Sequence, residues 1–114
     1  MKDRVEYPEG RIVQDADRLD TMGAVGISRC FATGCKLGHR IYDPDIKHVL
    51  HRSAEEYRSS QSTSINHFFE KLLLLKDRFH RESARKIARG RHEFMEEFLQ
   101  RFFAEWDGND ILVE

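Results

Sequence analysis

The chain has 114 residues, of which 39% are hydrophobic and 34% charged. A chain of this length forms one modest domain, which excludes a two-domain enzyme with an interdomain cleft. Its 19 Lys plus Arg and 20 Asp plus Glu give a formal net charge of −1, which argues against a general nucleic-acid binder. The longest apolar run, Leu72 to Leu75, is too short to cross a bilayer, and the charged N-terminus has no signal-peptide pattern. We therefore expect a cytoplasmic protein without membrane contact.

The first expected element is a helix from about residue 12 to residue 32. Its apolar residues recur at helical spacing and are Ile12, Ala16, Leu19, Met22, Ile27 and Phe31. Gly34 follows as a candidate helix stop. Gly23 and Gly26 lie inside this segment, and because glycine weakens a helix they predict a bend or the close approach of another helix. Cys30 and Cys35 lack the spacing of a metal or redox motif and are expected to be ordinary reduced cysteines.

The remaining elements follow a long connection, from about residue 33 to residue 62, in which helical periodicity is lost. Two further helices are expected, at about 63–79 and 82–106, with Ser62, Thr63 or Ser64 as the N-cap of the first and Gly108 closing the second. The turn between them is short, so they should pack as an antiparallel pair. The fold class is therefore predicted to be all-α.

Although the whole chain is nearly neutral, one stretch is strongly basic. Between Lys71 and Arg91 there are eight basic and two acidic residues. A solvated helix surface explains this pattern. Alternatively, the chain is a non-enzymatic helical interaction module that docks an acidic partner or nucleic acid through the 71–91 stretch. Nucleic acid is the less favoured partner, because the interleaved aromatic residues fall on the apolar helical stripe instead of facing a ligand.

An acidic cluster, Asp15, Asp17 and Asp20, lies near the start of the first expected helix. At 100° per residue, Asp17 and Asp20 share one side of that helix, whereas Asp15 lies about 200° away from Asp17. Asp15 and Asp17 should therefore not share one ligand site. Acids in the first turns of a helix also have a purely structural explanation, because they favour the positive end of the helix dipole.

The same segment carries a family resemblance. Ile12 to Asp20 (IVQDADRLD), continued by Met22 to Arg29 (MGAVGISR), closely resembles the last metal-binding helix of the HD-domain phosphohydrolases. Two later segments, Ser64 to Leu72 (SINHFFEKL) and Phe94 to Leu99 (FMEEFL), resemble the C-terminal helices of small bacterial and archaeal HD proteins. The resemblance extends from about Glu9 to Gly108. It implies the C-terminal portion of an HD-domain-like helical bundle, and hydrolysis of nucleotides or phosphoesters.

The resemblance also implies a metal site. In that family a divalent ion (Mn, Mg or Fe) is held by a histidine, an adjacent His-Asp pair and a distant aspartate. Asp17 is then the last of these ligands and the catalytic residue, while Asp15 and Asp20 support it from outside the ligand set, as helix cap or hydrogen-bond partner. Three further side chains are candidate phosphate or substrate contacts: Arg18, His67 and Lys71.

The sequence departs from the family upstream of this helix. Only fourteen residues precede Asp15, the chain has no His-Asp dipeptide, and all six histidines follow the acidic cluster. A single carboxylate cannot hold a catalytic ion. We therefore expect a truncated HD protein that is weakly active or inactive alone and that holds no catalytic ion without further ligands. Loss of the preceding helices also predicts an exposed apolar patch on the 12–31 helix, suited to self-association or to a complementary chain.

Overall fold

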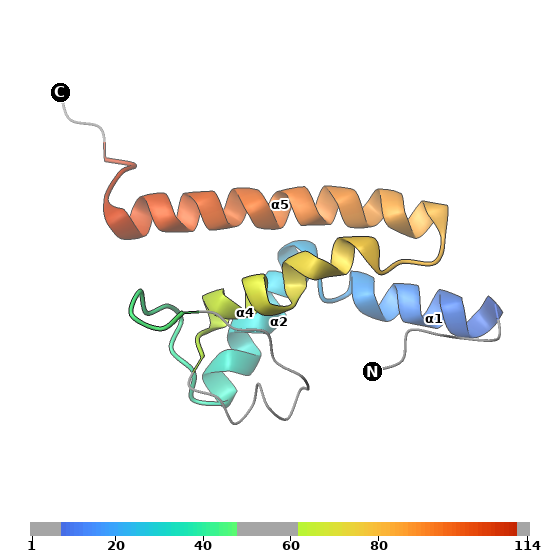
Figure 1. The fold of residues 1–114 in the computed structure, drawn as a ribbon, viewed down its shortest axis with the longest axis horizontal. Coiled ribbons are helices and arrows are strands. Elements are labelled where there is room, and N and C mark those ends of the chain that lie inside the picture. The colour runs from blue at the N-terminus through green and yellow to red at the C-terminus, as the bar shows by residue number, and fades with distance from the viewer. Residues whose placement is uncertain (1–7, 48–61, 112–114) are drawn as a thin grey trace.

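The computed structural model describes residues 8–47 and 62–111, and the regular elements in these ranges are all helical. They are α1 (Pro8–Leu19), α2 (Gly23–Lys36), α4 (Ser64–Glu70), the 3₁₀ helix η1 (Leu72–Asp77) and α5 (Glu82–Asp107). The all-α prediction is confirmed. In Figure 1 the long helix α5 lies along one side of the molecule, and the shorter elements form a second layer against it.

The first expected helix is two helices, so the prediction of one continuous helix over 12–32 is wrong. The break falls at residues 20–22, and α2 begins at Gly23 with φ +69°, a left-handed conformation that favours glycine. A Cβ added to Gly26 would overlap the backbone of Thr21. Both glycines therefore serve a sharp bend, which was one of the two expectations for them. Nor does α2 stop at Gly34, since it continues to Lys36.

Gly34 instead marks a close approach of α2 to α4. A Cβ at this position would overlap the hydroxyl of Ser64, the first residue of α4. One turn earlier, the buried Cys30 thiol donates to the Ser64 carbonyl at 3.5 Å. The connection that follows is irregular through residue 47, and residues 48–61 of the expected loop lie outside the described ranges.

The second expected helix tightens partway along its length. Thr63 is the N-cap of α4, where its hydroxyl accepts from the Asn66 amide at 3.1 Å, in agreement with one of the three predicted caps. The α-helix ends at Glu70 and continues as η1, so the expected helix over 63–79 is only partly α-helical. A short turn then reverses the chain, and α5 runs back antiparallel to α4 and η1, as predicted (Figure 1). Gly108, at φ +75°, caps α5 as expected.

The core lies between α5 and the second layer. Its most deeply buried apolar side chains are Met22, Ile65, Phe68, Ala88 and Met95. Toward the C-terminal end of α5, aromatic rings pack on one another in what we call the aromatic cluster: Phe31, Tyr42, Phe68, Phe69, Phe98, Phe102, Phe103 and Trp106.

Some large apolar side chains remain at the surface. Ile12, Val13 and Val25 on α1 and α2 are exposed, on the segment where the sequence predicted an apolar patch. Among residues 8–47 and 62–111, no helix combines the length and the hydropathy of a membrane span.

Candidate functional site

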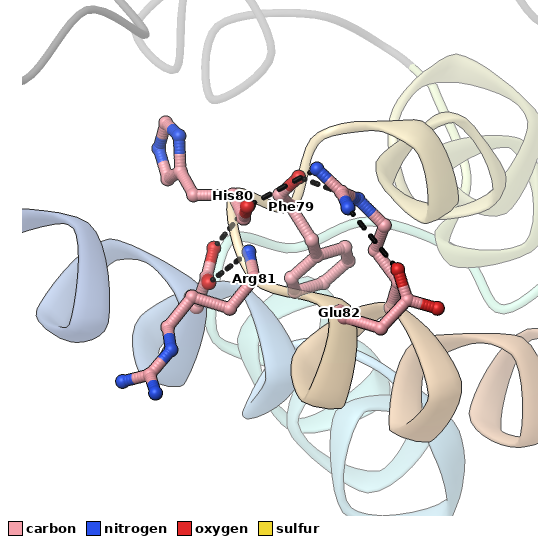
Figure 2. A network of polar contacts seen from close by, with 6 residues as sticks. Phe79, His80, Arg81 and Glu82 are labelled. Atoms are coloured by element: carbon pink, nitrogen blue, oxygen red, sulfur yellow. Dashed lines mark hydrogen bonds and ion pairs between the residues drawn. The ribbon is translucent and has the colours of Figure 1, made fainter.

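Asp15 is buried and holds the turn that precedes α5. Its Oδ1 accepts from the backbone N–H of His80 at 2.9 Å, and its Oδ2 accepts from that of Arg81 at 3.1 Å. Figure 2 shows these two bonds at the turn. Arg81 is the N-cap residue of α5, and its own side chain makes no capping bond. A carboxylate from α1 therefore stabilises the free amides at the start of a helix 66 residues further along the chain.

Two arginines also join α1 to the turn before α5 and to α5 itself. Arg18 donates from Nη1 to the Arg78 carbonyl at 2.6 Å, and Arg91 on α5 donates from Nη1 to the Leu19 carbonyl at 2.7 Å, at the end of α1. Bonds from a charged donor are stronger than neutral ones. These contacts fix the rotation of α1 against α5. A side-chain bond of 2.8 Å between Gln14 and His80 lies beside them. We call the residues that make these bonds the polar junction: Gln14, Asp15, Arg18, Leu19, Arg78, His80, Arg81 and Arg91.

Asp17 faces away from the polar junction. It is exposed, whereas Asp15 is only 3% exposed, so the two acids occupy opposite faces of α1 as the helical spacing predicted. No hydrogen bond or ion pair found among the described residues engages the Asp17 carboxylate. Asp20 is exposed in the bend after α1. The fixed rotation of α1 therefore presents the Asp17 carboxylate to solvent.

The described residues do not assemble a metal centre around Asp17. Within residues 8–47 and 62–111, no three His, Cys, Asp or Glu side chains are grouped so that they could hold an ion. One carboxylate supplies neither the affinity nor the geometry for a catalytic ion. The described donor set therefore does not fit a metal by itself, and no chemical step can be derived through one.

The other candidate contacts are dispersed. Arg18 is buried, and its guanidinium bonds to backbone, which gives it a structural role. His67 is half-buried on α4, and Lys71 is exposed where α4 passes into η1. No hydrogen bond or ion pair among the described residues joins His67 or Lys71 to Asp17.

Two open cavities lie in another part of the molecule. One, of about 330 Å³, is lined by Gly38, His39, Arg40, Asp43, Ile46 and Ser62. The other, of about 410 Å³, is lined by Tyr42, Pro44, Ile46, Lys47, Asn66, Phe69 and Phe103. None of the residues that the sequence singled out for chemistry lines either cavity. Behind the first, the buried Ser62 hydroxyl donates to the Glu70 carboxylate at 2.9 Å, a pair that no sequence motif indicated.

Some basic residues of the 71–91 stretch make hydrogen bonds within the fold. Arg85 donates to the Phe79 carbonyl at 3.2 Å and to the His80 carbonyl at 3.1 Å, both in the turn of Figure 2, and Arg91 belongs to the polar junction. Lys71, Lys76, Lys86 and Arg89 are exposed. No observation here favours nucleic acid over an ordinary solvated helix surface.

The fold resembles those of several solved structures, one of which is an HD-superfamily hydrolase. A protein of Bacillus thuringiensis, described as an HD-superfamily hydrolase, superposes with a TM-score of 0.72 at 44% identity, over 87% of this chain and 46% of its own. A protein of Lactobacillus plantarum superposes with a TM-score of 0.80 at 42% identity, over 92% of this chain and 52% of its own. YpgQ of Bacillus subtilis, an uncharacterised protein whose crystal structure has been determined in complex with ADP, is 38% identical over 102 residues.

These similarities fix the fold class as an HD-superfamily type of helical bundle. The chain spans only about half the length of the relatives that it matches, since the aligned region covers 90% of this chain but 42% of YpgQ. No protein-family model matches the chain.

Proposed function

We propose that the chain is a metal-dependent phosphohydrolase of the HD type, acting on nucleotides or phosphoesters, and that Asp17 supplies one metal ligand. The observation that carries the proposal is the exposed Asp17 carboxylate, which no hydrogen bond or ion pair within residues 8–47 and 62–111 engages, on a helix whose rotation is fixed by the polar junction. The 44% identity to an HD-superfamily hydrolase supports the hydrolase activity. The complex of YpgQ with ADP supports a nucleotide as the substrate.

The polar junction assigns different roles to neighbouring residues of α1. Asp15 and Arg18 act through the backbone of the turn before α5, and they position the helix instead of touching the ion or the substrate. Asp20 is exposed one residue after α1 ends and supports the site only through its charge. The remaining metal ligands then come from outside the described residues or from a complementary chain. On its own, the chain is weakly active or inactive.

The role of Asp17 can be tested by titrating the purified chain with Mn²⁺ and following paramagnetic broadening of its backbone amide signals, which detects even weak binding. Broadening should centre on α1 around Asp17 and disappear in Asp17→Asn. Asp77→Asn changes another exposed carboxylate, at the end of η1, and serves as the matched control. Broadening spread equally over the exposed carboxylates would contradict the assignment.

The hydrolase activity needs a second measurement. The chain is assayed with Mn²⁺ or Mg²⁺ against a panel of nucleotides and phosphomonoesters. We expect little or no turnover, and we expect any turnover to fall about 100-fold or more in Asp17→Asn but not in Asp77→Asn. Efficient turnover that survives in Asp17→Asn would rule out this metal-dependent mechanism.

A further inference from the structure

The larger of the two cavities has the size and the lining of a small-molecule site. Its volume of about 410 Å³ lies within the usual range for such sites. Side chains from the 42–47 segment, α4 and α5 line it, and most of them are apolar or aromatic: Tyr42, Pro44, Ile46, Lys47, Asn66, Phe69 and Phe103. None of these residues belongs to α1, and in Figure 1 the green 42–47 segment and α1 lie toward opposite ends of the molecule. The cavity is therefore a different site from the Asp17 carboxylate.

Three aromatic rings of the lining hold one another in place. Phe69 stacks on Phe103 with the ring centroids 6.4 Å apart, and Tyr42 meets Phe103 edge-on with the centroids 5.4 Å apart. Tyr42 also packs edge-on against Trp106. All three lining rings are half-buried, so each keeps part of its surface open. Rings that are already ordered can stack on a flat ligand at little further cost in conformational entropy.

Asn66 adds one deep polar group to this apolar lining. It is only 4% exposed, and its side-chain nitrogen donates to the Ile46 carbonyl at 2.8 Å, which fixes the amide group. No hydrogen bond within residues 8–47 and 62–111 engages the amide oxygen, Oδ1. This oxygen is not among the fully enclosed side-chain atoms that lack a partner, so it is open to a ligand. An acceptor fixed in an apolar cavity selects a ligand that carries a donor, such as an amino group.

Lys47 supplies the positive charge of the lining. Its side chain is exposed, and no hydrogen bond or ion pair to another described residue engages its ammonium group. The nearby Asp43 is already paired with Arg40 at 2.8 Å. A ligand whose ring enters the cavity and whose anionic group stays in solvent therefore matches the lining.

We propose that this cavity binds the base of an adenine nucleotide. The aromatic rings stack on the purine, the Asn66 Oδ1 accepts from its 6-amino group, and Lys47 faces the phosphate. Aromatic rings bind any base by stacking, whereas a fixed acceptor distinguishes the amino group of adenine from the carbonyl group of guanine or hypoxanthine. The site needs no metal ion, so it is independent of the role proposed for Asp17.

The base selectivity is tested by titrating the purified chain with nucleoside monophosphates in EDTA, followed by nuclear magnetic resonance. Adenosine monophosphate (AMP) should shift the signals of Tyr42, Phe69 and Phe103. Inosine monophosphate, which has a carbonyl group in place of the 6-amino group, should bind about tenfold more weakly. Asp17→Asn should bind AMP as the wild type does, because EDTA removes any contribution from a metal. Absence of AMP binding at millimolar concentration, or equal binding of the two nucleotides, would overturn the proposal.

The two polar contacts are tested by separate variants. Lys47→Gln should weaken AMP binding about fivefold and leave adenosine binding unchanged, because only AMP carries the phosphate. Lys36→Gln changes another exposed lysine, at the end of α2, and serves as the matched control. Adenosine binding that falls together with AMP binding in Lys47→Gln would contradict the phosphate contact.

Asn66→Ala should abolish the preference for AMP over inosine monophosphate, and a preference that persists in the folded variant would contradict the contact to the 6-amino group. This variant also loses the bond to Ile46, so its folding is checked first by circular dichroism. If it does not fold, the ratio of the two affinities in the wild-type chain decides the question.

Discussion

The two ends of α5 are attached to the rest of the molecule in different ways. At its start, the polar junction binds α1 through side-chain bonds to backbone groups at 2.6–3.1 Å. Toward its C-terminal end, the aromatic cluster packs rings against rings, with centroids 5.9 Å apart for Phe68 and Phe98 and 5.1 Å apart for Tyr42 and Trp106. The first attachment is directional and specifies a rotation, whereas the second fills volume and tolerates adjustment.

This difference matches the proposed tasks of the two ends. A helix that presents Asp17 to an ion must be held at one rotation, and hydrogen bonds of defined geometry hold it. The aromatic cluster holds its end of α5 through apolar contacts instead, and apolar burial is not directional. Substitutions at the two ends should therefore differ in kind as well as in size.

The largest effect is expected in the aromatic cluster. Phe68 has no exposed surface, and its ring stacks on Phe98 and makes a tilted contact with Phe31. Phe68→Ala should lower the free energy of unfolding by about 3–5 kcal/mol, measured by urea denaturation. Phe68→Leu keeps most of the volume and should cost much less. If the two variants were equally destabilised, volume would not be what the cluster provides, and the contrast with the polar junction would weaken.

An intermediate effect is expected at the polar junction. Asp15→Ala leaves the amides of His80 and Arg81 without their acceptor and should lower the free energy of unfolding by about 2–3 kcal/mol. Asp17→Ala, two residues along the same helix, is the control and should change stability by less than about 0.5 kcal/mol, because Asp17 is exposed. Equal losses in both variants would show that general charge near the helix, and not the bond to the turn, stabilises the contact.

The smallest effect concerns Cys30, at the contact of α2 with α4. Burial raises the pKa of its thiol from 9.0 to about 12. Above pH 9 the unfolded chain loses this proton while the folded chain keeps it, so the stability is present below pH 9 and is lost as the pH rises toward 12. By pH 10 the wild type should lose about 1 kcal/mol more than Cys30→Ala, measured by urea midpoints. The exposed Cys35 should react with a thiol reagent in the folded state, whereas Cys30 should react only after unfolding.

The sequence predicted the local features better than the long-range ones. Apolar periodicity located α5 and its Gly108 cap, and 100° spacing separated Asp15 from Asp17, because each of these depends on neighbours within a few turns. The glycines indicated a bend or a close approach, but the full break between α1 and α2 was not predicted, because a Gly with positive φ and a Gly inside a straight helix look alike in sequence. The acceptor role of Asp15 depends on a contact spanning 66 residues, which no local pattern reports.

Because Asp15 comes from α1, the His80 and Arg81 amides in the turn before α5 have no acceptor until α1 has packed against that turn. The His80 and Arg81 amides should then exchange hydrogen with solvent only when α1 lifts away, whatever the state of the rest of α5. These two amides are therefore an intrinsic reporter of α1 docking, readable by nuclear magnetic resonance without any label.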